Sequence, residues 1–160
     1  MSTQTPQSEA FWHDYTQHTG IASTDYDVVA FGDSPEMATE LANLVIAGTK
    51  RATASLLRDY ASPDALPKPG DHVVMLDGDG MPRAIWRTTE VTIKPLIDVD
   101  ERFAWDEGEG DRTRAWWLDA HRAFFGEQAA QEGLTMHDEI ETVFERFEIV
   151  WPLSLSDKQR

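Results

Sequence analysis

The residues with the greatest chemical potential lie together in one short segment, residues 48–55. It contains a lysine, an arginine, two threonines and a serine, and no other part of the chain groups an amine, a guanidinium and three hydroxyls so closely. A neutral amine can take a proton from a hydroxyl, and an ammonium can stabilise an oxyanion. Lys50 and Thr53 are therefore candidates for acyl-transfer chemistry.

The helix predicted from Pro35 to Ala47 gives Lys50 a second possible role. Ser34 is a suitable N-cap, and a proline at the first helical position loses no hydrogen bond. Apolar residues then recur at helical spacing, and Gly48 fits the left-handed position that often follows a helix. A lysine just beyond this end could simply complement the negative end of the helix dipole. Both roles stay open.

A second group of useful side chains falls in residues 104–111, which we expect to form an acidic loop interrupted by glycines. Its glycines lack the spacing of a dinucleotide-binding fingerprint. Trp105 lies among polar residues and is a candidate for stacking on a nucleobase, whereas Trp86, on a predicted strand, is expected in the core. Glu107 and Glu109 are candidate acids or bases.

Phosphodiester cleavage would use other side chains. A ribonuclease needs an acid–base pair around the phosphate and a cation for the charge that develops there. His72 and His121 are candidate proton carriers. The candidate cations are Lys50, Arg51, Arg58 and Arg87.

The sequence contains no convincing metal-binding motif. Residues 77–80 predict a turn between two strands, and residues 137–139 predict a surface turn. Neither stretch has the ligand spacing of a calcium or zinc site. We expect no metal and no other cofactor.

Composition narrows the class of protein. The chain has 160 residues, enough for one domain with a real core, and no cysteine, which excludes disulfides and thiolate nucleophiles. It has no apolar run of membrane-spanning length and no apolar block near its start, so a cytoplasmic protein is expected. Its formal net charge of -15 argues against binding long duplex nucleic acid. A nucleoside or a short single strand would still suit a small basic pocket.

The remaining pattern mixes helices and strands without regular alternation, which predicts an α+β fold. We expect one domain, with its core at about residues 11–152 and polar tails at both ends. The expected helices cover residues 9–18, 35–47, 56–60, 98–103 and 111–125, with a further short helix or turn at 127–133. The expected strands cover residues 28–31, 71–76, 83–93 and 142–151.

Several motifs, taken in order, resemble those of the ASCH domain family, a relative of the PUA-like RNA-binding domains, and in particular its larger bacterial members. The first is Gly48-x-Lys50-x-x-Thr53, which is similar to the signature of that family. Further matches run through most of the chain, from about Phe11 to Pro152: they are Phe31-Gly32-Asp33-Ser34-Pro35, Leu76-Asp77-Gly78, Arg87-Thr88-Thr89-Glu90-Val91, Glu107-Gly108-Glu109-Gly110-Asp111 and Glu145-Arg146-Phe147-Glu148.

The resemblance implies a small β-barrel flanked by helices and an action on nucleosides or RNA. One branch of the family looks like an amidohydrolase that removes the acyl group of N4-acylcytidine with a Lys, a Thr and a Glu. Carried over, these residues are Lys50, Thr53 and Glu107, with Glu109 as the near alternative. Another member type is described as a ribonuclease on single-stranded RNA. The small deacylases have an arginine where this chain has Ser55.

The implied chemistry places two demands on the structure. A lysine base at pH 7 needs its pKa lowered by roughly three units, about 4 kcal/mol, whereas a nearby Glu107 would raise it. Lys50 is therefore either a neutral base or a cation with Glu107 as the working acid or base. In addition, residues three apart in a straight strand face opposite sides, so Lys50 and Thr53 converge only through a bend.

We expect a metal-independent hydrolase for N4-acylcytidine-type substrates. A ribonuclease on single-stranded RNA and a non-catalytic module for RNA or modified nucleotides are the alternatives. The catalytic residues would be Lys50, Thr53 and Glu107. Substrate binding is assigned to five residues: Arg51, Ser55, Arg87, Trp105 and Glu109. The expected partner is a nucleoside or short single-stranded RNA, with no membrane; the oligomeric state is left open.

Overall fold

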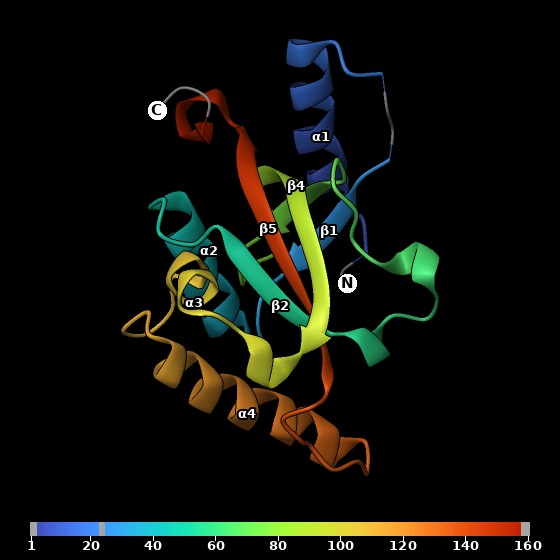
Figure 1. The fold of residues 1–160 in the computed structure, drawn as a ribbon. Helices are drawn as coiled ribbons and strands as arrows, with labels where there is room; N and C mark the ends of the chain where they lie inside the picture. Colours follow the sequence, from blue (N-terminus) through green and yellow to red (C-terminus); the bar gives the residue numbers. More distant parts are fainter. Residues whose placement is uncertain (1–2, 23–24, 158–160) are drawn as a thin grey trace.

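A five-stranded sheet forms the centre of the molecule (Figure 1), which a computed structural model describes for residues 3–22 and 25–157. The strands lie in the order β1-β3-β4-β5-β2, and all neighbours are antiparallel except β1 and β3. Their bounds are β1 Asp27–Ala30, β2 Ala52–Leu56, β3 His72–Leu76, β4 Pro82–Pro95 and β5 Glu141–Trp151. The four α-helices are α1 Pro6–Thr19, α2 Pro35–Ile46, α3 Glu101–Glu107 and α4 Arg114–Gln131.

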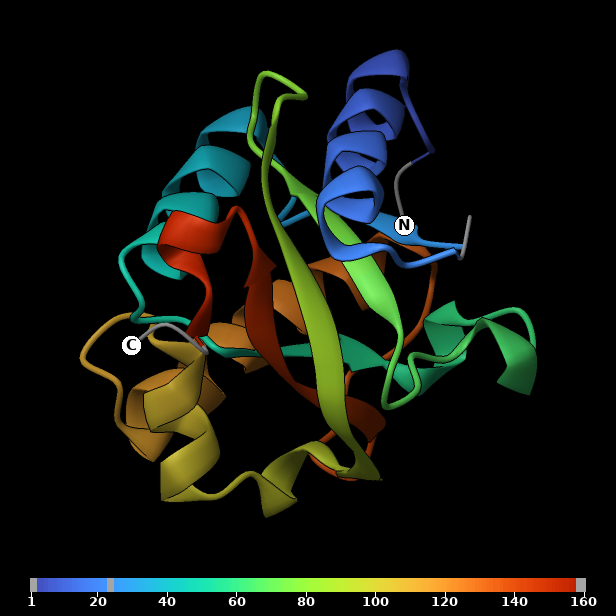
Figure 2. The same cartoon turned by 90° about the horizontal axis from the view of Figure 1, so that it is seen from above.

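The two longest strands, β4 and β5, give the sheet its curl. They pair from Ile85 with Trp151 to Pro95 with Glu141, and their register shifts between Thr88 and Glu90. Such irregularities increase local twist and bend a strand, because one strand carries an extra residue. The curled sheet is a half-barrel, with α4 along one end and α1 near the other (Figures 1 and 2).

Helices cover both faces of the sheet, as the alternation of side chains along β4 shows. Trp86 faces α2 and stacks between Phe31 and Phe147, at centroid distances of 5.6 and 4.2 Å. Its neighbour Ile85 points to the opposite face, into a cluster with Trp12 and other residues around α1. A third cluster packs the outer side of β2 and β5 against α3 and α4. The core position predicted for Trp86 is confirmed.

Most predicted elements are confirmed, and the exceptions lie at β2 and around α3 and α4. Residues 104–107, expected in an acidic loop, form the second half of α3, whose N-cap is Asp100. The helix expected from Asp111 begins at Arg114 with Thr113 as its N-cap. Asp111 instead accepts hydrogen bonds from the backbone and hydroxyl of Thr113, which holds the turn before the helix. Strand β2 was not predicted.

Helix α4 also continues through Gly126 to Gln131, although we expected a break there and a separate short helix or turn at residues 127–133. A glycine inside a helix costs only about 1 kcal/mol, and packing can offset this amount. Burial on either side of the glycine supplies that packing here, because Phe125 and Ala129 both lie in the core.

The polar tails are shorter than expected within the described residues. Helix α1 already begins at Pro6, where Thr5 forms a capping box with Ser8. After β5 the chain forms a 3-10 turn at Leu153–Leu155, and the carboxylate of Asp157 contacts Arg51. The rest of the expected tails, residues 1–2 and 158–160, lies outside the described residues.

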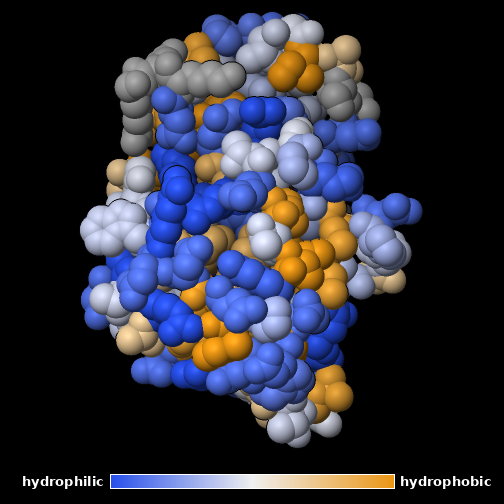
Figure 3. Space-filling view, in the orientation of Figure 1, coloured by the Kyte–Doolittle hydropathy of each residue, from blue (hydrophilic) through white to orange (hydrophobic). Residues whose placement is uncertain are grey.

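The visible surface of the molecule is mainly polar, as expected of a folded domain (Figure 3). Hydrophilic side chains predominate on the face seen in Figure 3, and hydrophobic ones gather there in small separate groups. Within residues 3–22 and 25–157, the helices are all too short or too polar to cross a lipid bilayer.

Candidate functional site

A cavity of about 310 Å³ lies between α2, α4, the start of β2 and the connection from α3 to α4. One part of its lining is polar and consists of Lys50, Thr53, Glu107, Glu109 and His121. The other part is largely apolar and consists of Phe31, Gly32, Met37, Leu41, Ala54, Trp116, Ala120, Phe124 and Phe125. The cavity therefore offers ionisable groups beside a surface suited to a flat or apolar ligand.

The end of α2 sets the direction of Lys50. Gly48 has the predicted left-handed conformation, with φ of 87°. The amides of Thr49 and Lys50 both donate to the carbonyl of Leu44, at 3.0 and 3.1 Å, so the chain wraps around the helix end. The side chain of Lys50 then enters the cavity just before β2 begins.

The ammonium of Lys50 is fully enclosed, with 1% of the residue exposed. It donates to the carboxylate of Glu107 at 2.9 Å, to the carboxylate of Glu109 at 3.0 Å and to the carbonyl of Ala52 at 2.8 Å. These three contacts use its three N–H groups. The ring of Phe31 lies 5.1 Å from the nitrogen.

A close backbone approach brings Glu107 to Lys50. Glu107 ends α3, and Gly108 follows with φ of 79° against the backbone of Thr49. A Cβ atom on Gly108 would lie 2.6 Å from the carbonyl oxygen of Thr49, so only glycine fits without a shift. The amide of Arg51 also donates to the carbonyl of Asp106 at 2.7 Å. The end of α3 is thereby fixed to the segment that carries Lys50.

His121 supports Glu107 from α4. Its ring stacks on Trp117, with centroids 3.8 Å apart, and its Nδ1 lies 2.8 Å from the carbonyl oxygen of the same residue. Because a carbonyl only accepts, Nδ1 carries a hydrogen. Nε2 faces Oε1 of Glu107 at 3.5 Å, and this buried oxygen has no hydrogen bond in the described structure. An imidazolium would donate toward it.

These contacts shift the pKa values of Lys50, Glu107, Glu109 and His121 in different directions. Burial opposes a charge on Lys50, but Glu107 and Glu109 outweigh it and raise the pKa of the ammonium. Burial also opposes a charge on Glu107, but Lys50 outweighs it and holds the pKa of that carboxyl well below its usual range. For Glu109, burial together with the charge of Glu107 outweighs Lys50 and raises the pKa to about 7.

The carboxylate of Glu107 also shifts the pKa of His121. Burial would lower the pKa of this imidazole, but contact with Glu107 outweighs burial and raises it. Of the two versions of Lys50 that the sequence left open, the geometry favours the cation.

Thr53 lies in β2, directly opposite Glu145 of β5. Its hydroxyl makes no hydrogen bond among the described residues, and the residue lines the same cavity as Lys50. The bend that this arrangement requires lies between the end of α2 and the start of β2 at Ala52. The structure thus brings Lys50, Thr53, Glu107 and Glu109 to one cavity.

Two of the residues assigned to substrate binding lie close to Lys50 in sequence but outside the cavity. Arg51 contacts Asp157 at 2.9 Å and donates to the carbonyl of Val45 at 2.8 Å. It thereby occupies the helix-end position that the sequence offered to Lys50. The hydroxyl of Ser55 lies 2.7 Å from that of Tyr60.

The other two such residues also lie outside the cavity. Arg87 pairs with Glu148 at 3.1 Å, on the strand pair β4–β5. Trp105 is 55% exposed on α3, and the guanidinium of Arg112 stacks over its ring at 3.7 Å.

Sequence reasoning missed the apolar lining of the cavity and gave His121 only the role of a ribonuclease proton carrier. The one available signal was helical spacing, which places Trp117, His121 and Phe124 on one side of α4. That pattern is equally typical of an ordinary buried face. The contact between His121 and Glu107 depends on packing between α3 and α4, which spacing does not reveal.

A metal ion is the other chemical possibility at this position. Donor atoms of Glu107, Glu109 and His121 all lie within 4.8 Å of one another. However, the ammonium of Lys50 already contacts both carboxylates. A divalent ion would have to displace that ammonium or share the space with it, at a large electrostatic cost.

Comparison with known proteins identifies a matching family and similar solved structures. A family model described as "ASCH domain" matches residues 27–151. The crystal structure of an ASCH domain from Lactobacillus crispatus JV V101 is 29% identical and covers 93% of this chain and 97% of its own, with a TM-score of 0.83. Protein EF3133 from Enterococcus faecalis V583 is 38% identical, covers 89% of this chain and 86% of its own, and has a TM-score of 0.81. No curated protein matches the chain.

Proposed function

The chain belongs to the ASCH domain family, whose PUA-like fold is often proposed to bind RNA, and from this premise we propose that it is a metal-independent amidohydrolase for N4-acylcytidine-type substrates. The observation that carries the proposal is the burial of the Lys50 ammonium between Glu107 and Glu109, in a cavity that Thr53 also lines. A nucleophile, a proton acceptor and a cation for an oxyanion are the parts that acyl transfer requires.

Glu109, rather than Lys50, serves as the general base in this proposal. Lys50 keeps its proton because its pKa is raised, so it has no free electron pair at neutral pH. Glu109 has a pKa of about 7, which suits a group that gains and loses a proton during each turnover.

The first half-reaction transfers the acyl group to Thr53. The Thr53 hydroxyl loses its proton to Glu109 as its oxygen attacks the amide carbonyl. Once neutral, Glu109 holds the ammonium less strongly, and the third N–H of Lys50 becomes available to the oxyanion. Collapse of the tetrahedral intermediate breaks the C–N bond, and the proton on Glu109 passes to the leaving amine of cytidine.

The second half-reaction restores the enzyme. Water attacks the Thr53 ester, Glu109 takes a proton from the water, and Lys50 again stabilises the oxyanion. Collapse releases the carboxylic acid, and the Thr53 oxygen regains its proton from Glu109. Glu107 stays ionised throughout and holds Lys50 in place, with His121 behind it.

The free nucleoside N4-acetylcytidine tests this function. We expect the wild-type protein to release cytidine and acetate without added metal and in the presence of a chelator, as followed by chromatography. Thr53→Val should reduce the rate by at least a hundredfold, whereas Thr53→Ser retains a nucleophile and should retain part of the rate. A folded wild-type protein that releases no cytidine would contradict the proposal.

Two other functions use the same cavity. A ribonuclease is supported by His121, which lines the same cavity as Lys50, but both ring nitrogens of His121 already face protein groups, Trp117 and Glu107. Cleavage of single-stranded RNA that disappears in Lys50→Ala would favour this function. Salt-dependent binding of RNA with no product of either kind would favour a non-catalytic binding module.

A further inference from the structure

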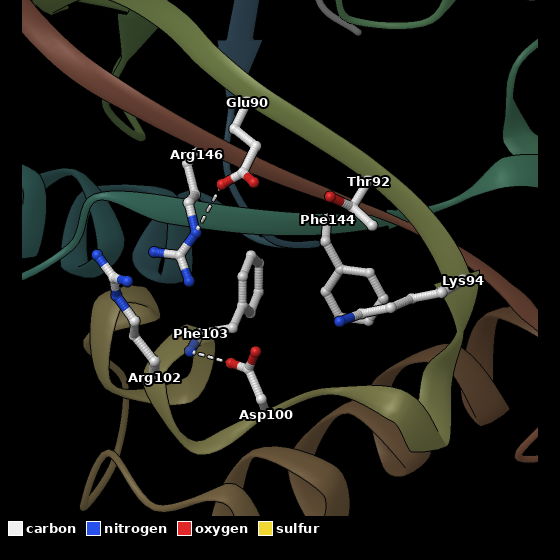
Figure 4. A pocket seen from close by; sticks show the side chains of 8 residues that line it. All are labelled: Glu90, Thr92, Lys94, Asp100, Arg102, Phe103, Phe144 and Arg146. Atoms are coloured by element: carbon white, nitrogen blue, oxygen red, sulfur yellow. Dashed lines mark hydrogen bonds and ion pairs between the residues drawn. The ribbon is translucent and has the colours of Figure 1, made fainter.

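A second cavity, of about 230 Å³, lies on the outer side of the β4–β5 pair, against the first half of α3 (Figure 4). Its lining is rich in polar and charged groups and consists of Glu90, Thr92, Lys94, Asp100, Arg102, Phe103, Phe144 and Arg146. Three of these residues are cations, a notable share in a chain with 14 lysines and arginines and 29 acidic residues.

Arg146 is the fixed cation of this group. It pairs with Glu90 at 3.3 Å and with Asp106 of α3, and its guanidinium lies 5.3 Å from the ring of Phe103. These contacts tie β5 to α3 and leave Arg146 little freedom. Its role is to hold the walls of the cavity together.

The side chains of Lys94 and Arg102 make fewer contacts with other charged groups than that of Arg146. The ammonium of Lys94 makes no hydrogen bond or ion pair within the described part of the chain, and it lies 5.1 Å from the ring of Phe144 (Figure 4). Arg102 is 86% exposed, and its nearest carboxylate, that of Asp106, is 3.9 Å away. Because exposed pairs at such a distance contribute little, both cations are available to an anionic ligand.

The cavity also offers hydrogen-bond acceptors between these cations. One oxygen of Asp100 accepts from the amide of Phe103, which leaves its second oxygen open to a ligand. Glu90 and the hydroxyl of Thr92 lie on the strand opposite. Cations for phosphate groups and carboxylates for hydroxyls are the partners that a ribose–phosphate chain requires.

We propose that this cavity binds the ribose–phosphate backbone of single-stranded RNA, with Lys94 and Arg102 on phosphates and Asp100 on a 2′-hydroxyl. The inference rests on the proposed function for the chemistry at Lys50 and deepens it. The α3 segment contributes to both cavities, with Glu107 at the first and Asp100, Arg102 and Phe103 at the second. In this proposal an RNA strand that follows α3 contacts both cavities, with its acylated cytidine in the first and its backbone in the second. The substrate is then an acylated cytidine within RNA.

Binding of a short, unmodified, fluorescently labelled single-stranded RNA tests the inference by anisotropy. We expect Lys94→Gln/Arg102→Gln to bind about tenfold more weakly than wild type. The dependence of log affinity on log salt should become shallower by about 1.4, because each phosphate that a cation neutralises on a single strand contributes about 0.7 to that slope. The control Lys68→Gln/Arg83→Gln removes two positive charges from residues that do not line this cavity and should bind like wild type. Both single variants, Lys94→Gln and Arg102→Gln, are measured too, and circular dichroism confirms folding.

Several outcomes would overturn the inference. Wild-type affinity in the double variant, or an equal loss of affinity in the control, would show that this cavity does not hold RNA. Equal affinity for DNA of the same sequence would show that the 2′-hydroxyl is not recognised. Displacement of the RNA by millimolar inorganic phosphate would show that the cavity is a simple anion site. Because the oligonucleotide carries no acyl group, these results are independent of whether N4-acetylcytidine is hydrolysed.

Discussion

At the scale of single residues, Lys50 and two carboxylates divide three roles among themselves. Glu107 is deeply buried and stays ionised, Lys50 stays protonated, and the pKa of Glu109 lies at about 7. The separation arises because Lys50 and His121 both face Glu107, whereas Glu109 competes with Glu107 for the same ammonium. The residue at the edge of the group is therefore the one that can exchange a proton.

The pH dependence of hydrolysis follows from Glu109. A base with a pKa of about 7 is ionised above that pH and protonated below it. We expect kcat/KM for N4-acetylcytidine to fall about tenfold for each pH unit below 7. Glu109→Gln should lose at least a hundredfold in rate and should lack this acid limb. A limb that persists unchanged in Glu109→Gln would assign the base to another group.

The stability of the domain depends on the pairing of Lys50 with Glu107. Lys50→Met leaves a buried carboxylate without its partner, and we expect it to lower the free energy of unfolding by about 3–5 kcal/mol at pH 7. Adding Glu107→Gln removes the stranded charge and should restore part of that loss. Urea denaturation of the two variants and of wild type measures both effects. A double variant no more stable than Lys50→Met would contradict the pairing.

Sequence motifs sufficed to single out Lys50, Thr53 and Glu107, which the structure places at one cavity. They could not decide the protonation state of Lys50, because that state depends on burial and on Glu109 as a second carboxylate. They also led to the assignment of Arg51 to substrate binding, although its side chain contacts the end of α2 and Asp157. Neighbours in sequence point in opposite directions at the start of a strand.

At the scale of elements, the site depends on how α3 meets the segment between α2 and β2. Gly108 lets the two backbones approach, and Asp106 accepts a hydrogen bond from the amide of Arg51. Glycine spacing predicted a loop here, but not that α3 extends to Glu107 or that its end packs on Thr49. Long-range backbone contact of this kind has no signature in one sequence.

Gly108→Ala tests this contact. The new Cβ would meet the carbonyl of Thr49 in a backbone conformation that alanine adopts poorly. We expect it to cost about 3 kcal/mol of stability and to reduce hydrolysis more than tenfold, because Glu107 moves away from Lys50. Gly133→Ala is the control: its φ is 74°, but no atom lies within 4 Å of the added Cβ, so it should cost only about 1 kcal/mol and spare hydrolysis. Equal effects of the two variants would refute the role of the close contact.

At the scale of the whole molecule, net charge bears on which ligands we propose. The formal charge of -15 opposes binding of a long polyanion, and the proposed contacts of Lys94 and Arg102 with phosphates would span only a few nucleotides. The α+β class, predicted from the mixed pattern of helices and strands, and the small β-barrel flanked by helices, implied by the family resemblance, are confirmed by the curled half-barrel sheet and the solved relatives. Strand β2 was not predicted, since its five residues carry little alternation of their own.

Discrimination between single and double strands follows from this charge. We expect a duplex RNA of about 16 base pairs to compete at least tenfold more weakly than a single strand of the same length for the labelled oligonucleotide. Competition by anisotropy at near-physiological salt measures the difference. A duplex that competes as well as the single strand would contradict the short-footprint account.

The measurement that bears most directly on the central claim is mass spectrometry of the protein quenched during its first turnover of N4-acetylcytidine. The account predicts an acetyl group on the peptide that contains Thr53, present in wild type and absent in Thr53→Val, with cytidine released in step with its formation. Release of cytidine by Thr53→Val at the wild-type rate, with no acetylated peptide in either protein, would contradict it.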